Sequence, residues 1–184
     1  MEKVKKVVII GPESTGKSTL CELLAKHFKG RFCPEFAREY LLKNGTDYTY
    51  EDLLVIAKGQ IALENEAVAT AQKAFNESGR QSKVFLDTDM YVMKVWCEFV
   101  FGKCHPYILE QIAARKYDLY LLCKPDLPWV KDELREYPDL ERREQLYGIY
   151  KNILENQSTP WVEISGDYTK RLATGIEAVN KLLI

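Results

Sequence analysis

The strongest constraint on this chain is an eight-residue motif close to its start. Residues 11–18 read GPESTGKS and match the pattern G-x-x-x-x-G-K-S. Residues 7–10 (VVII) precede the motif directly, and four consecutive apolar residues predict a central strand that is buried on both faces. Residues 17–28 follow with apolar side chains at helical spacing. The motif therefore occupies a strand-to-helix turn, which is where a glycine-rich loop can wrap a phosphate group.

Each residue type in this motif has a physical task in binding a nucleoside triphosphate. The glycines allow main-chain angles that bulkier residues resist, so that amide groups of the loop can point at a phosphate. Lys17 can bridge the β- and γ-phosphates, and the Ser18 hydroxyl can be a ligand of Mg²⁺. We predict nucleotide binding by the following residues of this segment: Gly11, Glu13, Ser14, Thr15, Gly16, Lys17, Ser18 and Thr19.

Short apolar runs alternate with longer helical patterns along the chain, which predicts βαβ units. Strands are expected at 7–10, 31–33, 84–86, 119–123 and 161–164, and helices at about 17–28, 51–78, 90–100, 107–115, 141–155 and 169–183. Thr49 and Asp52 are spaced as a capping box for the longest helix, and Gly79 suits its end. We predict a three-layer α/β fold, a P-loop NTPase with a five-stranded, mostly parallel sheet, and one domain over residues 1–184.

Residues 124–138 (KPDLPWVKDELREYP) break this alternation. They contain three prolines and many charges, and they exceed the ordinary connection length of about 2–6 residues. We interpret them as part of a lid that extends over about 124–143. Three arginines of this lid could neutralise charge on a transferring phosphoryl group, or could be solvated surface charges: Arg135, Arg142 and Arg143.

Trp129 and Asp132 of the lid lie three residues apart. An aromatic surface beside a carboxylate would suit a planar, cationic ring of a substrate. The alternative is that Trp129 packs within the lid.

Two carboxylates follow the strand predicted at 84–86. Mg²⁺ favours a carboxylate at the end of a strand beside the phosphate loop, and Asp87 holds that position. We predict that Asp87 binds the metal directly or through water, and that Asp89 faces the acceptor substrate. The alternative for both is capping of the following helix.

A second candidate acceptor site follows the strand predicted at 31–33. Glu35 and Arg38 are three residues apart, so on a helical turn they share one face. Glu35 could accept the proton of an attacking hydroxyl, and Arg38 could orient a phosphate or the substrate. The alternative is an ordinary surface ion pair.

Composition excludes several other classes of protein. Lys plus Arg is 26 and Asp plus Glu is 27, and this balance lacks the positive excess of proteins that coat nucleic acid or anionic membranes. The five cysteines form no C-x-x-C pair, so we expect reduced, buried thiols rather than a zinc or redox site. Without a signal-peptide pattern or a run of about 20 apolar residues, we expect a cytoplasmic protein.

A phosphate loop alone fits a kinase, a GTPase or a motor ATPase. The chain has no N-K-x-D sequence for guanine recognition, and motor ATPases usually need a longer chain. The segments GPESTGKSTL, PEFAREYL, FLDTD, GKCHPY and YDLYLLCKPDLPWVKDELRE occur in this order. In this order they resemble the ribosylnicotinamide kinase domain of NadR proteins and the related stand-alone P-loop ATPases, over almost the whole chain.

The resemblance implies ATP and Mg²⁺ as cosubstrates and phosphorylation of the 5′-hydroxyl of nicotinamide riboside to nicotinamide mononucleotide. Lys17, Glu35, Asp89, Arg135 and Arg142 are then the candidate catalytic residues. The chain begins at the first strand of that domain, so we expect it to lack the adenylyltransferase and DNA-binding domains of some NadR proteins. Two alternatives remain: a nucleotide-switched regulatory ATPase, and a kinase for another nucleoside or metabolite.

The two histidines complete the candidates. His27 lies on the first predicted helix, and we assign it no chemistry. His105 lies in the GKCHPY segment, where a role near the acceptor is open but a structural role is the simpler interpretation. No Ser-His-Asp or Cys-His spacing indicates covalent catalysis.

Overall fold

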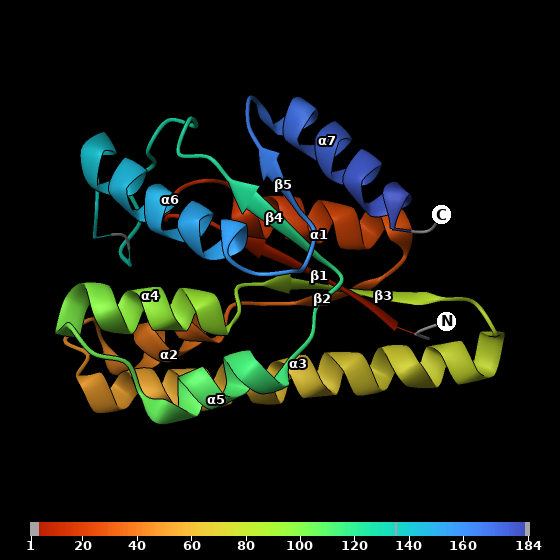
Figure 1. Cartoon of the computed structure of the whole chain (residues 1–184), viewed down its shortest axis with the longest axis horizontal. Helices are drawn as coiled ribbons and strands as arrows, with labels where there is room; N and C mark the ends of the chain where they lie inside the picture. The colour runs from red at the N-terminus through yellow and green to blue at the C-terminus, as the bar shows by residue number, and fades with distance from the viewer. Residues whose placement is uncertain (1–3, 135, 183–184) are drawn as a thin grey trace.

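Strand β1 (Val4–Ile10) lies at the centre of a parallel sheet in the computed structural model, which describes residues 4–134 and 136–182 (Figure 1). The sheet has five strands in the order β2 (Arg31–Cys33), β3 (Ser82–Asp87), β1, β4 (Leu119–Cys123) and β5 (Trp161–Ile164). All the neighbouring pairs are parallel, which confirms the predicted sheet. Because β1 pairs with both β3 and β4, the loop after β1 emerges between the carboxyl ends of these two strands.

Alternate residues of β1 face the two sides of the sheet. Val7 and Ile9 belong to the core under α1 (Lys17–Phe28) and α7 (Tyr168–Lys181). Val8 and Ile10 belong to the core under α3 (Tyr50–Ser78), α4 (Met90–Phe101) and α6 (Leu140–Glu155). All four side chains are fully buried, as a strand covered on both faces requires. The predicted three-layer α/β fold is therefore confirmed.

A smaller helical cluster lies at one end of the molecule. Helices α2 (Phe36–Asn44) and α5 (Pro106–Ala114) pack there against α3 and α4, with their own group of buried residues (Figure 1). Helix α2 was not predicted from the sequence, because only Ala37 and Leu41 of its nine residues are buried and so its apolar pattern is weak. This helix is important for the site because it begins directly after Glu35.

The boundaries of the longest helix agree with its sequence signals. The Thr49 hydroxyl accepts a hydrogen bond from the Asp52 N–H, and the Asp52 carboxylate accepts one from the Thr49 N–H, which completes the capping box. Gly79 ends the helix with a φ of +67°. Strand β1, by contrast, begins three residues earlier than expected. Its polar start is paired with Asp118, which accepts hydrogen bonds from Lys5 and from the Lys6 N–H.

Two glycines inside helices are expected to respond oppositely to alanine. A Cβ at Gly59 of α3 would lie 2.2 Å from the Phe36 ring, whereas a Cβ at Gly148 of α6 has nothing within 4 Å. Gly59→Ala is therefore expected to destabilise the fold by about 1–3 kcal/mol through overpacking. Gly148→Ala is expected to stabilise it by about 0.5–1 kcal/mol through helix propensity. Urea unfolding measures both, and equal stabilisation by the two variants would show that the contact between Gly59 and Phe36 is not tight.

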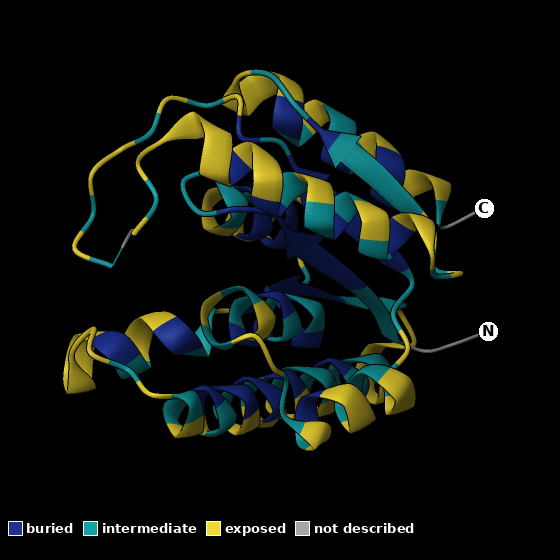
Figure 2. Ribbon diagram, turned by 60° about the vertical axis from the view of Figure 1, so that its left-hand side comes forward, coloured by how far each residue is buried: buried dark blue, intermediate teal, exposed yellow. Residues whose placement is uncertain are grey.

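The segment interpreted as a lid from the sequence is mainly a loop between β4 and α6. The described residues of this loop are 124–134 and 136–139, and residues 140–143 of the predicted lid form the first turn of α6. Among the described residues of this loop, Pro125 is buried and the others are exposed or intermediate, and Figure 2 shows the loop at the edge of the molecule. No helix within the described residues is long and apolar enough to cross a membrane.

Candidate active site

The loop over residues 11–16 turns the chain from the buried end of β1 into α1. Gly11 has a φ of +143°, and a Cβ there would lie 2.6 Å from the main-chain oxygen of Cys123 at the end of β4. The loop can therefore approach β4 only with glycine at this position. The Thr15 hydroxyl and the Lys17 ammonium each donate a hydrogen bond of 2.8 Å to the Pro12 carbonyl. Lys17 is thus folded back over the loop that the sequence predicts to bind phosphate.

A buried arginine from α7 braces this loop, and the sequence analysis missed it. Arg171 is 1% exposed and donates hydrogen bonds to the carbonyl oxygens of Thr15 (3.0 Å), Lys124 (3.0 Å) and Gly166 (2.6 Å), and to the carboxylate of Asp126. These acceptors belong to the phosphate loop, the start of the lid loop and the connection from β5 to α7. Arg171 therefore ties three loops together at the carboxyl edge of the sheet. The signal in the sequence that could have identified Arg171 is its position on the apolar face of an amphipathic helix.

A cavity of about 290 Å³ opens beside the phosphate loop. Loop residues form one end of it, and Glu35 and Arg38 lie along it. Its remaining wall comes from α4, α6 and the lid loop and is rich in rings: Trp96, Phe99, Tyr137 and Tyr150. The sequence analysis did not select these rings, because the helical spacing of the first two and of Tyr150 is also that of a buried core. The cavity therefore joins a phosphate-binding end to an aromatic end.

Glu35 is positioned by a buried side chain of α3. Gln60 is 2% exposed, and its Oε1 accepts the Phe36 N–H at 2.8 Å while its Nε2 donates to the Pro34 carbonyl at 3.2 Å. The residues on both sides of Glu35 are thereby fixed to the long helix. Gln60 has no motif in the sequence, so this positioning role emerges only from the structure.

The Glu35 carboxyl lies close enough to Asp87 and to Lys17 to feel the charge of both. Burial, reinforced by the negative charge of Asp87, raises the pKa of Glu35 to about 7, against the attraction of Lys17. Burial likewise raises the pKa of Asp87, while Lys17 and a hydrogen bond from Ser18 oppose the rise. A carboxyl with a pKa near neutrality can accept a proton at working pH and release it again. In the structure the positive charge of Lys17 is thus close enough to Glu35 to act on the protonation of its carboxyl.

The residues expected to hold a metal ion fit a nucleotide-bound Mg²⁺. Asp87 is 1% exposed and its Oδ1 has no hydrogen-bond partner, and the same holds for the buried Thr88 hydroxyl next to it. Within the described residues, no group of three or more His, Cys, Asp or Glu side chains could hold a metal by itself. Mg²⁺ typically takes one or two protein ligands and completes its shell with water and phosphate oxygens. Ser18 and Asp87 match that requirement.

The structure does not bring Asp89 to the cavity. Its Oδ1 accepts the main-chain N–H of Tyr91 and of Val92 at the start of α4, and its Oδ2 accepts the Tyr120 hydroxyl at 2.7 Å. The residue is 2% exposed, and burial raises its pKa to about 7. Both oxygens are therefore used inside the fold. The alternative that the sequence analysis left open, helix capping, is the arrangement observed, so the expected contact of Asp89 with an acceptor is corrected.

Arg38 lies along the cavity together with Glu35, and its guanidinium pairs with Asp132 of the lid loop. The Arg38 guanidinium donates two hydrogen bonds to the Asp132 carboxylate, at 3.1 and 3.3 Å, and so joins α2 to the lid loop. Trp129 does not line the cavity, and its indole N–H points at Glu13 instead. The expected pairing of Trp129 with Asp132 around a cationic ring is therefore corrected. The rings that do line the cavity lie on α4, on α6 and at Tyr137.

The lid arginines occupy different environments. Arg142 is exposed, and its guanidinium lies 5.6 Å from the centre of the Tyr137 ring. Arg143 is 4% exposed, and its Nε and Nη1 have no hydrogen-bond partner. Arg135 lies outside the described residues. Of the two described arginines, only Arg143 carries a buried, unsatisfied cation.

The two histidines contact aromatic rings, and the cysteines are unpaired thiols. The His105 ring stacks on Tyr50 with 3.7 Å between ring centres, and its Nε2 contacts the Tyr50 carbonyl at 2.9 Å. His27 lies in the last turn of α1 beside Phe28. All five cysteines are free thiols; Cys104 is partly exposed and the rest are buried.

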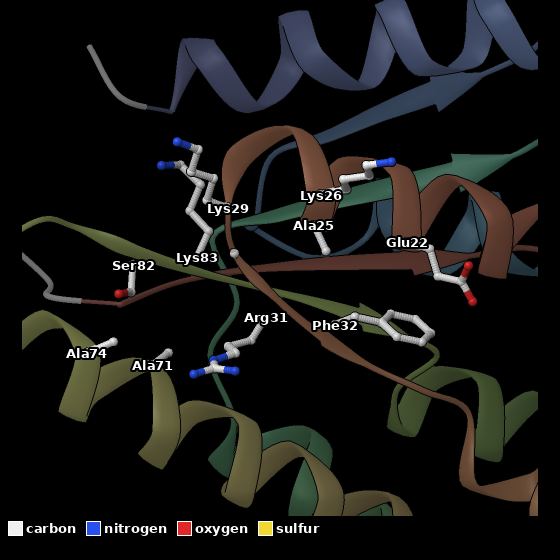
Figure 3. A pocket seen from close by; sticks show the side chains of 11 residues that line it. Glu22, Ala25, Lys26, Lys29, Arg31, Phe32, Ala71, Ala74, Ser82 and Lys83 are labelled. Carbon is white, nitrogen blue, oxygen red and sulfur yellow. The ribbon is translucent and has the colours of Figure 1, made fainter.

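A second cavity, of about 460 Å³, opens at the opposite edge of the sheet, where β2 and β3 begin (Figure 3). Its lining includes four cations (Lys26, Lys29, Arg31 and Lys83) and one carboxylate, that of Glu22. None of these charged side chains is fully buried. Solvated cations account for this lining, so we assign it no ligand.

Comparisons with known proteins agree with the fold. The family described as "AAA domain" matches residues 6–171. The trifunctional NAD biosynthesis/regulator protein NadR of Escherichia coli (strain K12) is 30% identical over 185 residues, which cover 98% of this chain and 43% of the relative. The chain thus spans less than half the length of that relative.

Solved structures give the same picture. The crystal structure of NadR protein in complex with NR aligns with a TM-score of 0.79 and 26% identity, over 98% of this chain and 50% of that chain. The crystal structure of NadR protein in complex with NAD and AMP-PNP aligns with a TM-score of 0.74 and 25% identity, over the same shares of the two chains. Thymidylate kinase from Ehrlichia chaffeensis shares the fold, with a TM-score of 0.62 and 15% identity over 98% of this chain and 100% of that chain.

Proposed function

The chain belongs to the AAA domain family and has the fold of P-loop kinases, and from this premise we propose that it phosphorylates the 5′-hydroxyl of nicotinamide riboside with ATP. The products would be nicotinamide mononucleotide and ADP. The similarity to NadR, including a structure in complex with NR and another with AMP-PNP, supports both substrates.

One observation carries the proposal: Glu35 lies in the same cavity as the phosphate loop, where burial raises the pKa of its carboxyl to about 7. A kinase needs a carboxylate that accepts the hydroxyl proton close to the transferring phosphate. Glu35 meets this requirement by burial and by its position beside Lys17. A hydrolytic switch would have no need of an acceptor end to the cavity.

The acceptor end suits a cationic, aromatic substrate. Trp96, Phe99 and Tyr150 offer apolar ring surfaces, and Glu136 adds a carboxylate. The Trp96 indole N–H donates to the Tyr48 hydroxyl at 2.9 Å, and that hydroxyl donates to Glu136 at 3.2 Å. This chain of hydrogen bonds orients an indole ring and a negative charge at the same end. A pyridinium ring would gain from both.

The mechanism follows from positioning and charge. In the proposed reaction Lys17 releases the Pro12 carbonyl and contacts the β- and γ-phosphates, while main-chain amides of the loop hold the remaining oxygens. Glu35 accepts the proton of the 5′-hydroxyl as the hydroxyl oxygen attacks the γ-phosphorus of ATP, and ADP leaves. Ser18 and Asp87 would hold Mg²⁺, which when bound neutralises charge on the β- and γ-phosphates.

Arg143 is our candidate for the cation that stabilises the transferring group. Arg143 is not one of the residues that line the cavity, but it lies three and seven residues before Leu146 and Tyr150, which do line it, and so it shares their face of α6. A buried guanidinium with two nitrogens that lack a hydrogen-bond partner is costly, and a phosphate would accept hydrogen bonds from them. Arg143→Met is therefore expected to lower kcat by about 10²–10³-fold without destabilising the unliganded protein.

Arg142→Met is the matched control, because Arg142 precedes Arg143 and is exposed. Its kcat is expected to stay within about twofold of the wild-type value, as for a solvated charge. Steady-state kinetics and the melting temperature measure both variants. If Arg143→Met were as active as Arg142→Met, the assignment of Arg143 to the phosphate would be wrong.

The acceptor is tested by comparing kcat/KM for nicotinamide riboside with that for neutral ribosides such as inosine and thymidine. The proposal predicts a preference of about 10²-fold or more for the cationic riboside, since a neutral ring loses the attraction of Glu136 and of the ring faces. A higher kcat/KM for a neutral riboside would assign the chain to another nucleoside. Turnover with none of them would contradict a riboside kinase.

A further inference from the structure

Two side chains of the phosphate loop hold the lid loop. The Glu13 carboxylate accepts the main-chain N–H of Tyr137 at 2.6 Å through Oε1 and that of Glu136 at 2.9 Å through Oε2. The Ser14 hydroxyl accepts the Val130 N–H at 3.1 Å. Both acceptors come from positions of the motif at which any residue type is allowed. The pattern G-x-x-x-x-G-K-S alone therefore does not call for these contacts.

The two hydrogen bonds that the Glu13 carboxylate accepts are stronger than bonds between neutral groups. A carboxylate that accepts two main-chain N–H groups forms charge-assisted hydrogen bonds, and here each oxygen takes one of them. The donors are adjacent residues of the lid loop more than 120 positions away in sequence. Together with the hydrogen bond from the Tyr48 hydroxyl to Glu136 and the contact of the Tyr137 ring with Phe99, these bonds hold the second half of the lid loop in place.

The lid loop has a separate attachment on the acceptor side. Asp132 of the loop pairs with Arg38 of α2, next to Glu35. The loop is thus attached at one point to the helix beside the proposed base and at another to the loop that is proposed to bind the triphosphate. Between these points, Leu134 and Glu136 line the cavity.

We infer that Glu13 is a positioning residue that couples the phosphate loop to the lid. Its carboxylate holds the main chain of Glu136 and Tyr137 over the cavity, so that water is kept from the γ-phosphate and the phosphoryl group passes to the acceptor. This role rests on the proposed function and adds to it, because Glu13 acts through the lid and not on the reacting atoms. The main-chain amide of Glu13 remains a candidate phosphate ligand.

Loss of the carboxylate has a specific consequence. Without it the Glu136 and Tyr137 amides lose their acceptor, so the main chain of the lid loop is held less firmly at these two residues, while the phosphate loop keeps Lys17 and its glycines. The protein should then still bind ATP but lose part of its protection against water. Hydrolysis of ATP should increase relative to transfer, which is a change that simple destabilisation does not produce.

The experiment compares hydrogen exchange and product ratios in the wild type, Glu13→Ala and Glu13→Gln, with Glu133→Ala as an exposed lid carboxylate for control. Exchange of the Glu136 and Tyr137 amides is expected to accelerate by about tenfold or more in Glu13→Ala. The exchange rate in Glu13→Gln should lie between those of the wild type and Glu13→Ala, since the glutamine amide keeps one of the two acceptor oxygens. The ratio of ADP formed to mononucleotide formed, measured with ATP and nicotinamide riboside, should increase by about tenfold in Glu13→Ala and not in Glu133→Ala.

Unchanged exchange at residues 136 and 137 in Glu13→Ala would overturn the inference, whatever the wild type does with a riboside. An unchanged product ratio with accelerated exchange would overturn the role in excluding water. If the wild type transfers nothing to the riboside, the proposed function fails, and the exchange measurement with acceptor-independent ATP hydrolysis still decides the coupling. Should Glu13→Ala not fold, Glu13→Gln decides both measurements.

Discussion

Replacing Lys17 with alanine is expected to lower kcat for phosphoryl transfer by about 10³-fold while the protein stays folded. Lys17 is the cation of the phosphate loop, and charge stabilisation on the transferring group supplies most of the rate enhancement in this chemistry. Its side chain is partly buried and donates a hydrogen bond to the Pro12 carbonyl of the same loop, and it belongs to none of the three hydrophobic cores. The melting temperature should therefore change little.

Lys26→Ala is the control for this variant. Lys26 lies on the same helix, α1, but near its far end beside the second cavity, and it is exposed. Its kcat is expected to equal that of the wild type. Undiminished transfer by Lys17→Ala would show that the phosphate loop is not the site of the reaction.

Glu35→Gln is expected to lower kcat/KM by about 10²–10⁴-fold, the range for loss of a general base. The pH dependence gives a second signature. Because the pKa of Glu35 is raised to about 7, the carboxyl is protonated and inactive as a base on the acid side. The logarithm of kcat/KM should rise with pH up to about 7 and then level off.

In Glu35→Gln this acid limb should disappear together with most of the activity. The comparison is needed because burial also raises the pKa of Asp89 to about 7, although Asp89 caps α4 and does not line the cavity. An acid limb that persists unchanged in Glu35→Gln would assign the titration to another group and contradict the role of Glu35 as base.

The fold was predictable because its signals are local. Four consecutive apolar residues identify β1, glycines with positive φ shape the loop after it, and the capping box of Thr49 and Asp52 gives the start of α3. Each signal depends on residues within a few positions of one another. Helix α2 was missed for the same reason, since its nine residues bury only two side chains.

The parts of the candidate site that depend on tertiary contacts were not predictable in this way. Asp132 and Trp129 are three residues apart, but Asp132 pairs with Arg38, 94 positions away. Arg171 and Gln60 belong to no motif, and their roles follow from carbonyl and amide groups that the fold brings within reach. Arg142 and Arg143 are adjacent in sequence, yet the rotation of a helix exposes the first and buries the second. Spacing along the chain carries none of this information.

The most direct test of the account is to incubate the protein with ATP and nicotinamide riboside and to quantify ADP and nicotinamide mononucleotide together. The account predicts that both form in equal amounts in the presence of the riboside, and that ADP formation falls to a small residual rate without it. ADP formed at the same rate with and without the riboside, with no mononucleotide, would contradict the proposed phosphoryl transfer.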